Sequence, residues 1–514
     1  MVPELGHVHT TMPLICFLVL TSLERNKNNR QTLNPREALL EIPKVHFNSM
    51  STQVVAAASS CLFPPNEEEI AGAVTNASPI SSNRISSIDV LRGVALLGIL
   101  VMNIDLFGNP EIVHDIPVGL PIDAFTGPHI HINLALLLVK WVFFEGKMRG
   151  LFTMLFGAGV ILFTSRAERR GSTEIADIYM RRNLLLMIFG VLHACFIWIG
   201  DILFDYGFIA LLFLYPARKL KPATLLWLGT FLSVVVSTVS TSLYLQATQD
   251  FSLSKKIASI QAQQSSGSPI TAAQKELLHK WKDHVESQRV TPEKTRQAVE
   301  EATLSYPASI LDRAQGYQSA FHLMHIDLLP DYLSPMLIGM GLMKLGFFTG
   351  ELSFASYWWT AILGFGISVP LYVLGILKTY AGHFYFLDMD KWIWLPYYLT
   401  REAGTLAIAA TMLILIKCGY LKTPQRLLAA VGRTAFSNYI LTSIICQTIF
   451  VWGPWKLYGR LEYYQLMYVV FGVWIINLTI SPLWLKKFAF GPLEWCWRSL
   501  TYGSVQSMRL TTKP

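Results

Sequence analysis

Long apolar runs, separated by short polar segments, recur along the chain from residue 88 onward. Each run carries few charged residues, and a helix satisfies its own backbone hydrogen bonds in lipid, so the pattern predicts membrane-spanning helices. The candidate spans are 88–107, 150–165, 183–199, 202–215, 223–245, 332–348, 354–377, 393–416, 434–452 and 463–484. We therefore expect an all-α, polytopic integral membrane protein with about ten transmembrane helices.

Residues 1–86 do not follow this pattern and are rich in Ser, Asn and Pro. Their apolar run at 14–20 is too short to cross a bilayer, which takes about 20 residues. Acidic residues at 67–69 argue against a transit peptide. We expect a disordered N-terminal extension. The sequence leaves open whether translation starts at Met50 instead.

Basic residues are distributed unevenly between the two sides of these spans. If the first span starts inside, seventeen Lys and Arg residues lie in inner loops and the C-terminal tail, against six in short outer segments. Cytoplasmic loops of membrane proteins carry such an excess. The asymmetry favours a multi-pass protein of the cell (plasma) membrane with both termini cytoplasmic.

Two segments between the spans differ from the rest. Residues 132–148 are apolar but interrupted by Lys and Glu, which predicts an interfacial or re-entrant helix on the outer side. Residues 246–331 are polar, and helix-start signals at Thr271 with Gln274 and at Thr291 predict a soluble, outer helical insert. The expected domains are 1–86, a transmembrane half at 87–245, the insert, a C-terminal transmembrane domain at 332–505 and a tail at 506–514.

Composition supports the same fold class. Hydrophobic residues make up 52% of the chain and charged residues 15%, whereas soluble domains carry about 25% charged residues. A net charge of +8 suits nucleic-acid binding, but inner loops explain it in a membrane protein, so we expect the lipid bilayer and no nucleic acid as a partner. The six cysteines form no CxxC pair, which indicates neither a disulfide framework nor a zinc site. The sequence leaves open whether the protein forms a homo-oligomer.

The first span opens with charged residues at its inner edge. Asp89 and Arg92 lie three positions apart, on one face of a helix. One interpretation is an ion pair that fixes the depth and rotation of the helix in the membrane. The other is that these residues, together with the basic loop at 166–182, bind an anionic cytosolic ligand. The arginines of that loop are Arg166, Arg169, Arg170, Arg181 and Arg182.

A second polar group lies between the third and fourth spans. His193 is near the outer end of its helix, and Asp201 and Asp205 lie four residues apart at the start of the next helix, so both can face one side. A carboxylate beside a neutral imidazole fixes its tautomer and supports its charged form, as a general base requires. The alternative is a buried structural histidine, with aspartates that stabilise a tight hairpin.

Further histidines lie outside the apolar runs. His114, His129 and His131 fall in the outer loop after the first span, and His322 and His325 precede the sixth span. The His-x-His pattern at 129–131 supplies two metal ligands without a third. The sequence therefore predicts no metal site.

Several stretches, in order along the chain, resemble one family. Residues 87–93 (SIDVLRG) and 143–147 (FFEGK) resemble the first two segments of YeiB-like membrane proteins. Residues 432–439 (GRTAFSNY), 481–485 (SPLWL) and 490–498 (FGPLEWCWR) resemble domain of unknown function 418. The residues of this family motif are Arg433, Ser437, Asn438, Glu494 and Arg498.

The resemblance implies an acyltransferase. The family is grouped with transmembrane acyltransferases, and its first helix is similar to that of the lysosomal heparan glucosaminide acetyltransferase. Such an enzyme would take an acyl group from a cytosolic acyl-CoA, such as acetyl-CoA, as co-substrate. The acceptor would be a hydroxyl or amine on the outer side, on a sugar or an envelope lipid. In the lysosomal enzyme the essential histidine follows the first helix, so the outer-loop histidines compete with His193 for this role.

The leading hypothesis combines these features. Arg92 and the loop arginines would bind the CoA phosphates, because guanidinium groups match phosphate geometry. His193 or an outer-loop histidine would act as base or acyl carrier, oriented by Asp201 or Asp205. The rival hypotheses are a transporter or flippase without covalent chemistry, which inverted repeats would favour, and a scaffold whose insert binds a partner protein.

Overall fold

The computed structural model describes residues 86–110, 128–169, 174–236, 242–287, 291–303, 329–383 and 385–510, together with residues 306, 309, 310 and 313. All of them belong to the unit formed by Pro65–Pro514. The predicted N-terminal extension at 1–86 lies outside the described residues except for its last position. Its disorder therefore stays a prediction.

Helices make up the regular structure of the described residues, which contain no β-strand beyond an isolated bridge between Phe488 and Arg509. The all-α prediction is thereby confirmed. The elements, with η for a π-helical stretch, are α4 (Ser86–Gly108), α5 (Ile130–Val139), η4 (Lys140–Phe144), α6 (Lys147–Arg169), α7 (Ile175–Phe196), α8 (Leu203–Ile209), η5 (Ala210–Leu214), α9 (Tyr215–Ala217), α10 (Pro222–Phe231), η6 (Leu232–Val236), α12 (Ser242–Ser265), α13 (Ala272–Ser287), α14 (Pro292–Ala302), η7 (Leu329–Leu333), α16 (Ser334–Lys344), α17 (Phe354–Ala381), α18 (Phe386–Met389), η8 (Asp390–Trp394), α19 (Tyr397–Lys417), α20 (Lys422–Arg433), α21 (Ala435–Gln447), η9 (Thr448–Trp452), α22 (Tyr463–Leu485) and α23 (Pro492–Tyr502).

Six helical segments among the described residues are long and apolar enough to cross a membrane. They are Ser86–Gly108, Ile130–Arg169, Phe354–Ala381, Tyr397–Lys417, Ala435–Trp452 and Tyr463–Leu485, and two shorter apolar segments are Leu203–Ala217 and Pro222–Val234. The chain is an integral membrane protein whose helices contact the lipid bilayer. The predicted count of ten is not confirmed, because α7 and the η7–α16 pair, at the predicted spans 183–199 and 332–348, are not among the six.

The second of these segments is interrupted near its middle. η4 ends at Phe144 and α6 starts at Lys147. Between them Gly146 has a φ of +67°, a left-handed conformation that glycine adopts without steric penalty. An unbroken helix over these 40 residues would be about 60 Å long, twice the thickness of a bilayer core. The predicted interfacial helix at 132–148 forms the first part of this segment, and its position at the interface stays a prediction.

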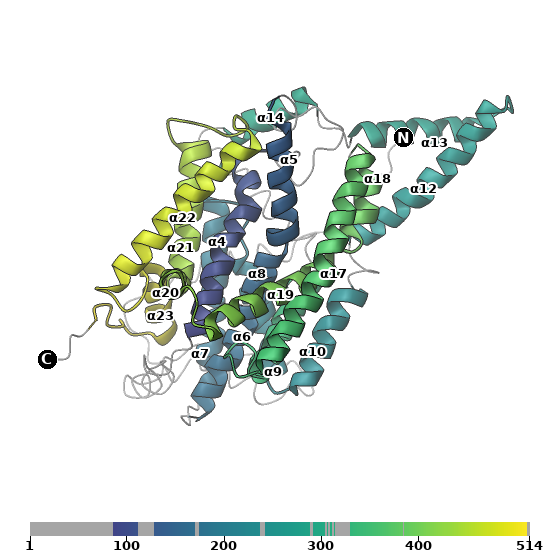
Figure 1. The fold of residues 1–514 in the computed structure, drawn as a ribbon. Helices are drawn as coiled ribbons and strands as arrows, with labels where there is room; N and C mark the ends of the chain where they lie inside the picture. The colour runs from purple at the N-terminus through teal and green to yellow at the C-terminus, as the bar shows by residue number, and fades with distance from the viewer. Residues whose placement is uncertain are drawn as a thin grey trace, which may run out of the picture. The chain divides into compact units, whose positions relative to one another are not determined.

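α4 packs against α6, α20, α21 and α22 (Figure 1). Its contact with α20 is close because both helices have glycine at the crossing. A Cβ atom at Gly93 would collide with the backbone of Leu428, and one at Gly432 would collide with the carbonyl of Asp89. Small residues permit such an approach between membrane helices. The N-terminal end of α4 is thereby held against α20.

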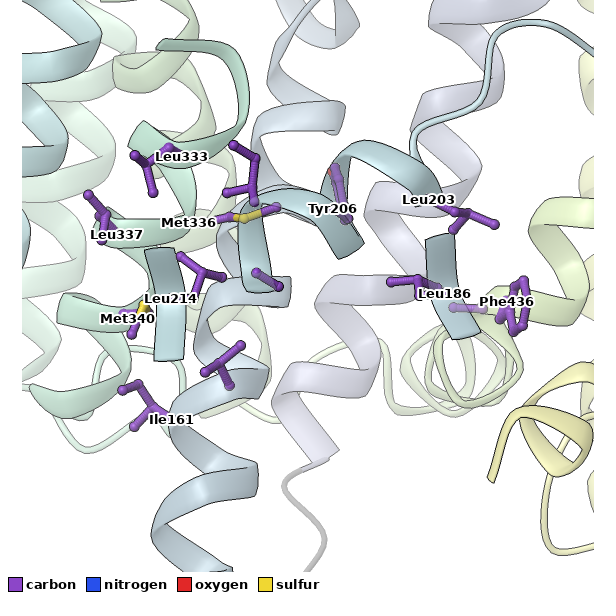
Figure 2. Packing of buried hydrophobic residues seen from close by; sticks show 14 of the residues in the cluster. Ile161, Leu186, Leu203, Tyr206, Leu214, Leu333, Met336, Leu337, Met340 and Phe436 are labelled. Atoms are coloured by element: carbon purple, nitrogen blue, oxygen red, sulfur yellow. The ribbon is translucent and has the colours of Figure 1, made fainter. Parts of the chain in front are cut away.

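A buried apolar cluster joins α8 to η7 and α16 (Figure 2). Tyr206 of α8 is 1% exposed, and Met336 and Met340 of α16 are fully buried. Figure 2 also shows Leu203 of α8 next to Leu186 of α7. The cluster therefore positions α8, and with it the aspartates at its start, between α7 and α16.

The predicted helix starts in the insert are confirmed. The backbone N–H of Thr271 donates to Gln274 Oε1 at 2.8 Å, and the N–H of Gln274 donates to Thr271 Oγ1 at 3.2 Å, which is a reciprocal capping box. Thr291 Oγ1 accepts the N–H of Lys294 at 3.3 Å. α12 packs on α13 and α18 through a small apolar cluster. The position of this insert outside the membrane stays a prediction.

The orientation of the chain can be tested by cysteine labelling. A cysteine at Gln261 of α12 is expected to react with a membrane-impermeant maleimide on intact cells, and one at Ser507 is not. The reason is the excess of positive charge in the loops assigned to the inside. The chain would first have its six native cysteines replaced. Labelling of Ser507→Cys after permeabilisation is the control, and the reverse pattern would contradict the orientation.

Candidate active site

His193 of α7 is 1% exposed and forms hydrogen bonds through both ring nitrogens. Its Nδ1 lies 2.9 Å from Asp201 Oδ1, and its Nε2 lies 3.0 Å from Ser443 Oγ. With an ionised Asp201 and a neutral ring, Nδ1 donates to the carboxylate and Nε2 is the acceptor that faces the Ser443 hydroxyl, which also lies 3.3 Å from the Tyr439 carbonyl. In enzymes, a carboxylate–imidazole–hydroxyl arrangement of this kind can activate the hydroxyl as a nucleophile.

The turn between α7 and α8 places Asp201 beside the imidazole. The N–H of Trp198 donates to the His193 carbonyl at 2.9 Å where α7 ends, and Asp201 Oδ2 accepts the N–H of Phe204 at 2.9 Å where α8 begins. A Cβ atom at Gly190 would overlap with the Phe204 nitrogen and with Asp201 Oδ2. Gly190, one turn before His193, therefore allows Asp201 and Phe204 to lie close to α7.

Ser443 was not among the residues predicted from the sequence. It lies on α21, is 1% exposed, and is separated from His193 by 250 positions. Tyr439, one turn earlier, packs against the imidazole with ring centroids 5.0 Å apart and donates to the Gly200 carbonyl at 3.3 Å. A hydroxyl pair, Thr442 and Ser443, in an otherwise apolar run was the available signal, because polar groups within the membrane need partners.

Of the two aspartates predicted beside His193, the structure pairs Asp201 with it. Asp205 is buried on α8 and faces Tyr332, and among the described residues no hydrogen bond or ion pair joins it to His193. The four-residue spacing does not place both on one helical face, because Asp201 precedes the first residue of α8. The candidate base therefore has one carboxylate partner.

The histidines predicted to lie in an outer loop have other surroundings. His129 Nδ1 lies 3.1 Å from Glu462 Oε1, and the ring packs near Tyr464. His131 is exposed, whereas His114, His322 and His325 lie outside the described residues. In the described part of the chain no group of three His, Cys, Asp or Glu side chains is arranged to bind a metal.

Lys140 lies between two carboxylates in the interior. Its Nζ is 2.6 Å from Asp105 Oδ2 of α4 and 3.4 Å from Glu145 Oε2, and the residue is 1% exposed. Lys147 donates to the Trp141 carbonyl at 3.0 Å. Opposite charges pair in such surroundings because an isolated buried charge is very costly.

A second buried ion-pair group lies around Arg401 of α19. Arg401 pairs with Asp331 and, at 2.8 Å, with Glu402 Oε1, while Arg149 Nη1 is 3.1 Å from Asp331 Oδ2. Ser233 donates to Glu402 Oε1 at 3.3 Å. No pattern in the sequence predicts this group, because its members come from α6, η6, η7 and α19.

Comparison with known proteins gives the family. The family described as "Protein of unknown function (DUF418)" matches residues 342–504. The uncharacterized protein YxaH of Bacillus subtilis is 30% identical over 448 residues, which cover 84% of this chain and 98% of that protein. The chain belongs to the DUF418 family. The uncharacterized protein YeiB of Escherichia coli is 27% identical, over 81% of this chain and 95% of its own. No solved structure matches the chain.

The DUF418 motif residues join the last helices of the bundle. Glu494 of α23 accepts the N–H groups of Phe436 and Ser437 at 2.7 and 3.2 Å, and its other oxygen accepts the Ser437 hydroxyl at 2.5 Å. It thus caps α21, the helix that carries Ser443. Burial raises the pKa of the Glu494 carboxyl, and these hydrogen bonds oppose the rise. Asn438 donates to Ser481 of α22 at 2.8 Å.

The DUF418 chain also brings two of the predicted phosphate-binding arginines together. Arg182 lies 4.1 Å from the ring centroid of Trp497, and Arg92 and Arg498 are close enough to act electrostatically on it. Arg92 Nη1 is 3.6 Å from Asp89 Oδ1, so the predicted ion pair is present. Of the other loop arginines, Arg166 and Arg181 are half-buried and Arg169 is exposed. Arg170 lies outside the described residues.

Proposed function

We propose that this DUF418 protein is a membrane acyltransferase. It would move an acyl group from a cytosolic acyl-CoA, such as acetyl-CoA, to a hydroxyl or amine acceptor on the outer side of the cell membrane. A sugar or an envelope lipid would carry that acceptor. The observation that supports the proposal is the buried hydrogen-bond chain from Asp201 through His193 to Ser443.

His193 would act as the general base. Asp201 holds the Nδ1 proton, so Nε2 is directed at the hydroxyl from which a proton must be removed. In one route Ser443 attacks the thioester, its proton passes through His193 to the departing CoA thiolate, and the acyl ester is then transferred. In the other route the acceptor hydroxyl takes the position of Ser443 and attacks directly.

The donor would bind near the N-terminal end of α4. Arg92, Arg182 and Arg498 form a group of guanidinium ions there, and paired N–H donors of arginine match the oxygens of phosphate. The CoA phosphates supply the negative charge that such a group requires. Asp89 orients Arg92 through their ion pair.

Replacement of Arg92 by alanine is expected to weaken acyl-CoA binding about tenfold, since a hydrogen bond to a charged group contributes about 1.5–3 kcal/mol. The protein should stay folded, because the Arg92 side chain is 30% exposed. Equilibrium binding of labelled acetyl-CoA measures the effect, with Arg460→Ala, an exposed arginine outside the proposed site, as the control. Loss of expression with unchanged affinity in the remaining protein would instead make Asp89–Arg92 a structural pair.

The proposed function is tested by an assay on the purified chain. Acetyl-CoA is added together with a membrane extract as acceptor, and free CoA thiol is measured with a colorimetric thiol reagent. Thiol release that depends on the protein and on the extract supports acyl transfer. Absence of both binding and release would refute it.

A transporter or flippase without covalent chemistry is the second candidate. The buried ion pairs around Lys140 and Arg401 favour it, because ionisable residues inside a membrane bundle often line a path for protons or ions. Glu402 Oε2 is buried without a hydrogen-bond partner among the described residues. Proteoliposomes that take up solute or protons without thiol release would support this function.

A further inference from the structure

A cavity of about 550 Å³ opens beside the start of α4, between α4, α20 and the end of α22. Lys422, Arg426 and Arg433 of α20 and Lys486 after α22 line it, and Asp89 is the carboxylate in the lining. Sites for small molecules have volumes of about 300–1,000 Å³. The cavity is thus large enough for a ligand and strongly positive.

The positive charge of the cavity follows from the sequence of α20. Lys422, Arg426 and Arg433 are spaced by four and seven residues, which places them along one face of the helix. They are all the charged residues of α20, which has no Asp or Glu. The other face packs on α4 through Leu428 and Gly432. Helix packing therefore turns every charge of α20 toward one cavity.

The cations at the mouth of the cavity are available to a ligand. Lys422, Arg426 and Lys486 are exposed, and no carboxylate of the described residues forms an ion pair with any of them. Arg433 lies deeper and is half-buried. Like charges around one cavity repel each other, and an anion relieves that repulsion. The neighbouring side chains Ala429, Pro482 and Leu485 add an apolar wall.

We propose that this cavity binds the phosphate groups of a phosphate ester whose organic part lies against the apolar wall. Arg426 and Arg433 would contact phosphate oxygens through paired N–H donors, and the lysines would add point charges. The ligand is either a soluble nucleotide-type molecule or the headgroup of an anionic phospholipid, which share this chemistry. The proposal concerns binding and holds whether or not the protein transfers acyl groups.

Binding is measured on the purified full-length chain in an uncharged detergent without phosphate. The soluble probes are coenzyme A and inorganic pyrophosphate, and the lipid probe is a phosphatidylcholine nanodisc with or without phosphatidylglycerol. A bound ligand stabilises the folded protein by RT ln(1 + L/Kd), where L is the free ligand concentration, so the thermal midpoint of unfolding rises with the logarithm of that concentration above Kd. We expect the thermal midpoint to rise with at least one of the soluble or lipid probes. The rise should be smaller at high ionic strength, because salt screens ion pairing.

The variants separate this cavity from general surface charge. Lys422→Gln with Arg426→Gln should weaken binding at least tenfold, and Lys486→Gln should weaken it severalfold. Lys487→Gln is the matched control, because Lys487 is exposed beside Lys486 but does not line the cavity. All these side chains are exposed, so the variants should fold.

Each outcome decides the proposal. A response to coenzyme A or pyrophosphate alone identifies a soluble phosphate ligand, and a response to phosphatidylglycerol alone identifies a lipid headgroup. Either result supports the site if the double variant loses it. No response to any probe overturns the proposal, as does full binding by the double variant or an equal loss in Lys486→Gln and Lys487→Gln.

Discussion

His193→Gln is expected to bind acyl-CoA normally and to lose acyl transfer by about 10²–10⁴-fold, the usual contribution of a general base. Glutamine keeps a hydrogen-bonding group between Asp201 and Ser443, so the packing of α7, α8 and α21 should survive. It has no nitrogen that accepts and releases a proton near neutral pH. Acetyl-CoA affinity and the rate of thiol release, measured on the same preparation, separate binding from chemistry.

The outer-loop histidines supply the controls for this experiment. His129→Gln changes a histidine that pairs with Glu462, away from Ser443. His131→Gln and His114→Gln complete the set and test the placement that the family resemblance suggests. Loss of turnover in one of these variants, with His193→Gln active, would move the base to the outer loop. Full turnover in all four would contradict a histidine mechanism and favour transport.

Lys140→Met is expected to destabilise the protein severely. The substitution removes the cation that lies between Asp105 and Glu145 and leaves two carboxylates buried near each other. Removal of one partner from a buried ion pair costs about 3–5 kcal/mol, a large fraction of the stability of a typical domain. We expect loss of the monodisperse peak in size-exclusion chromatography of detergent-solubilised protein, and a lower thermal midpoint in what remains.

A compensating substitution tests whether the charge is the cause. Asp105→Asn added to Lys140→Met should recover part of the stability, because it removes one of the two carboxylates that the first substitution leaves buried without their lysine. Lys378→Met is the matched control, since Lys378 is an exposed lysine of α17. If the Lys140→Met protein is as stable as the Lys378→Met protein, the buried ion pairs of Lys140 contribute little to the stability of the fold.

Features that depend on residues close together in the chain were predictable without the structure. The apolar runs at 88–107 and 463–484 correspond to α4 and α22, because a membrane helix needs a continuous apolar stretch wherever it lies in the bundle. The capping box at Thr271 was predictable because its hydrogen bonds join residues three apart. The Asp89–Arg92 pair follows from the same local geometry. The motif residues of the C-terminal part likewise led to the family.

Contacts between side chains that are far apart in the chain depend on how the helices pack, and they were not predictable. Ser443 reaches His193 across 250 positions, and Lys140 meets Asp105 of another helix. Helical spacing indicates which residues share a face, but packing determines which face another helix covers, and Gly190 sets that packing between α7 and α8. The prediction that Asp201 shares a helical face with Asp205 was also wrong, because Asp201 lies in the turn before α8. The basic cavity between α4, α20 and α22 arises in the same way, since no single segment of the chain contains it.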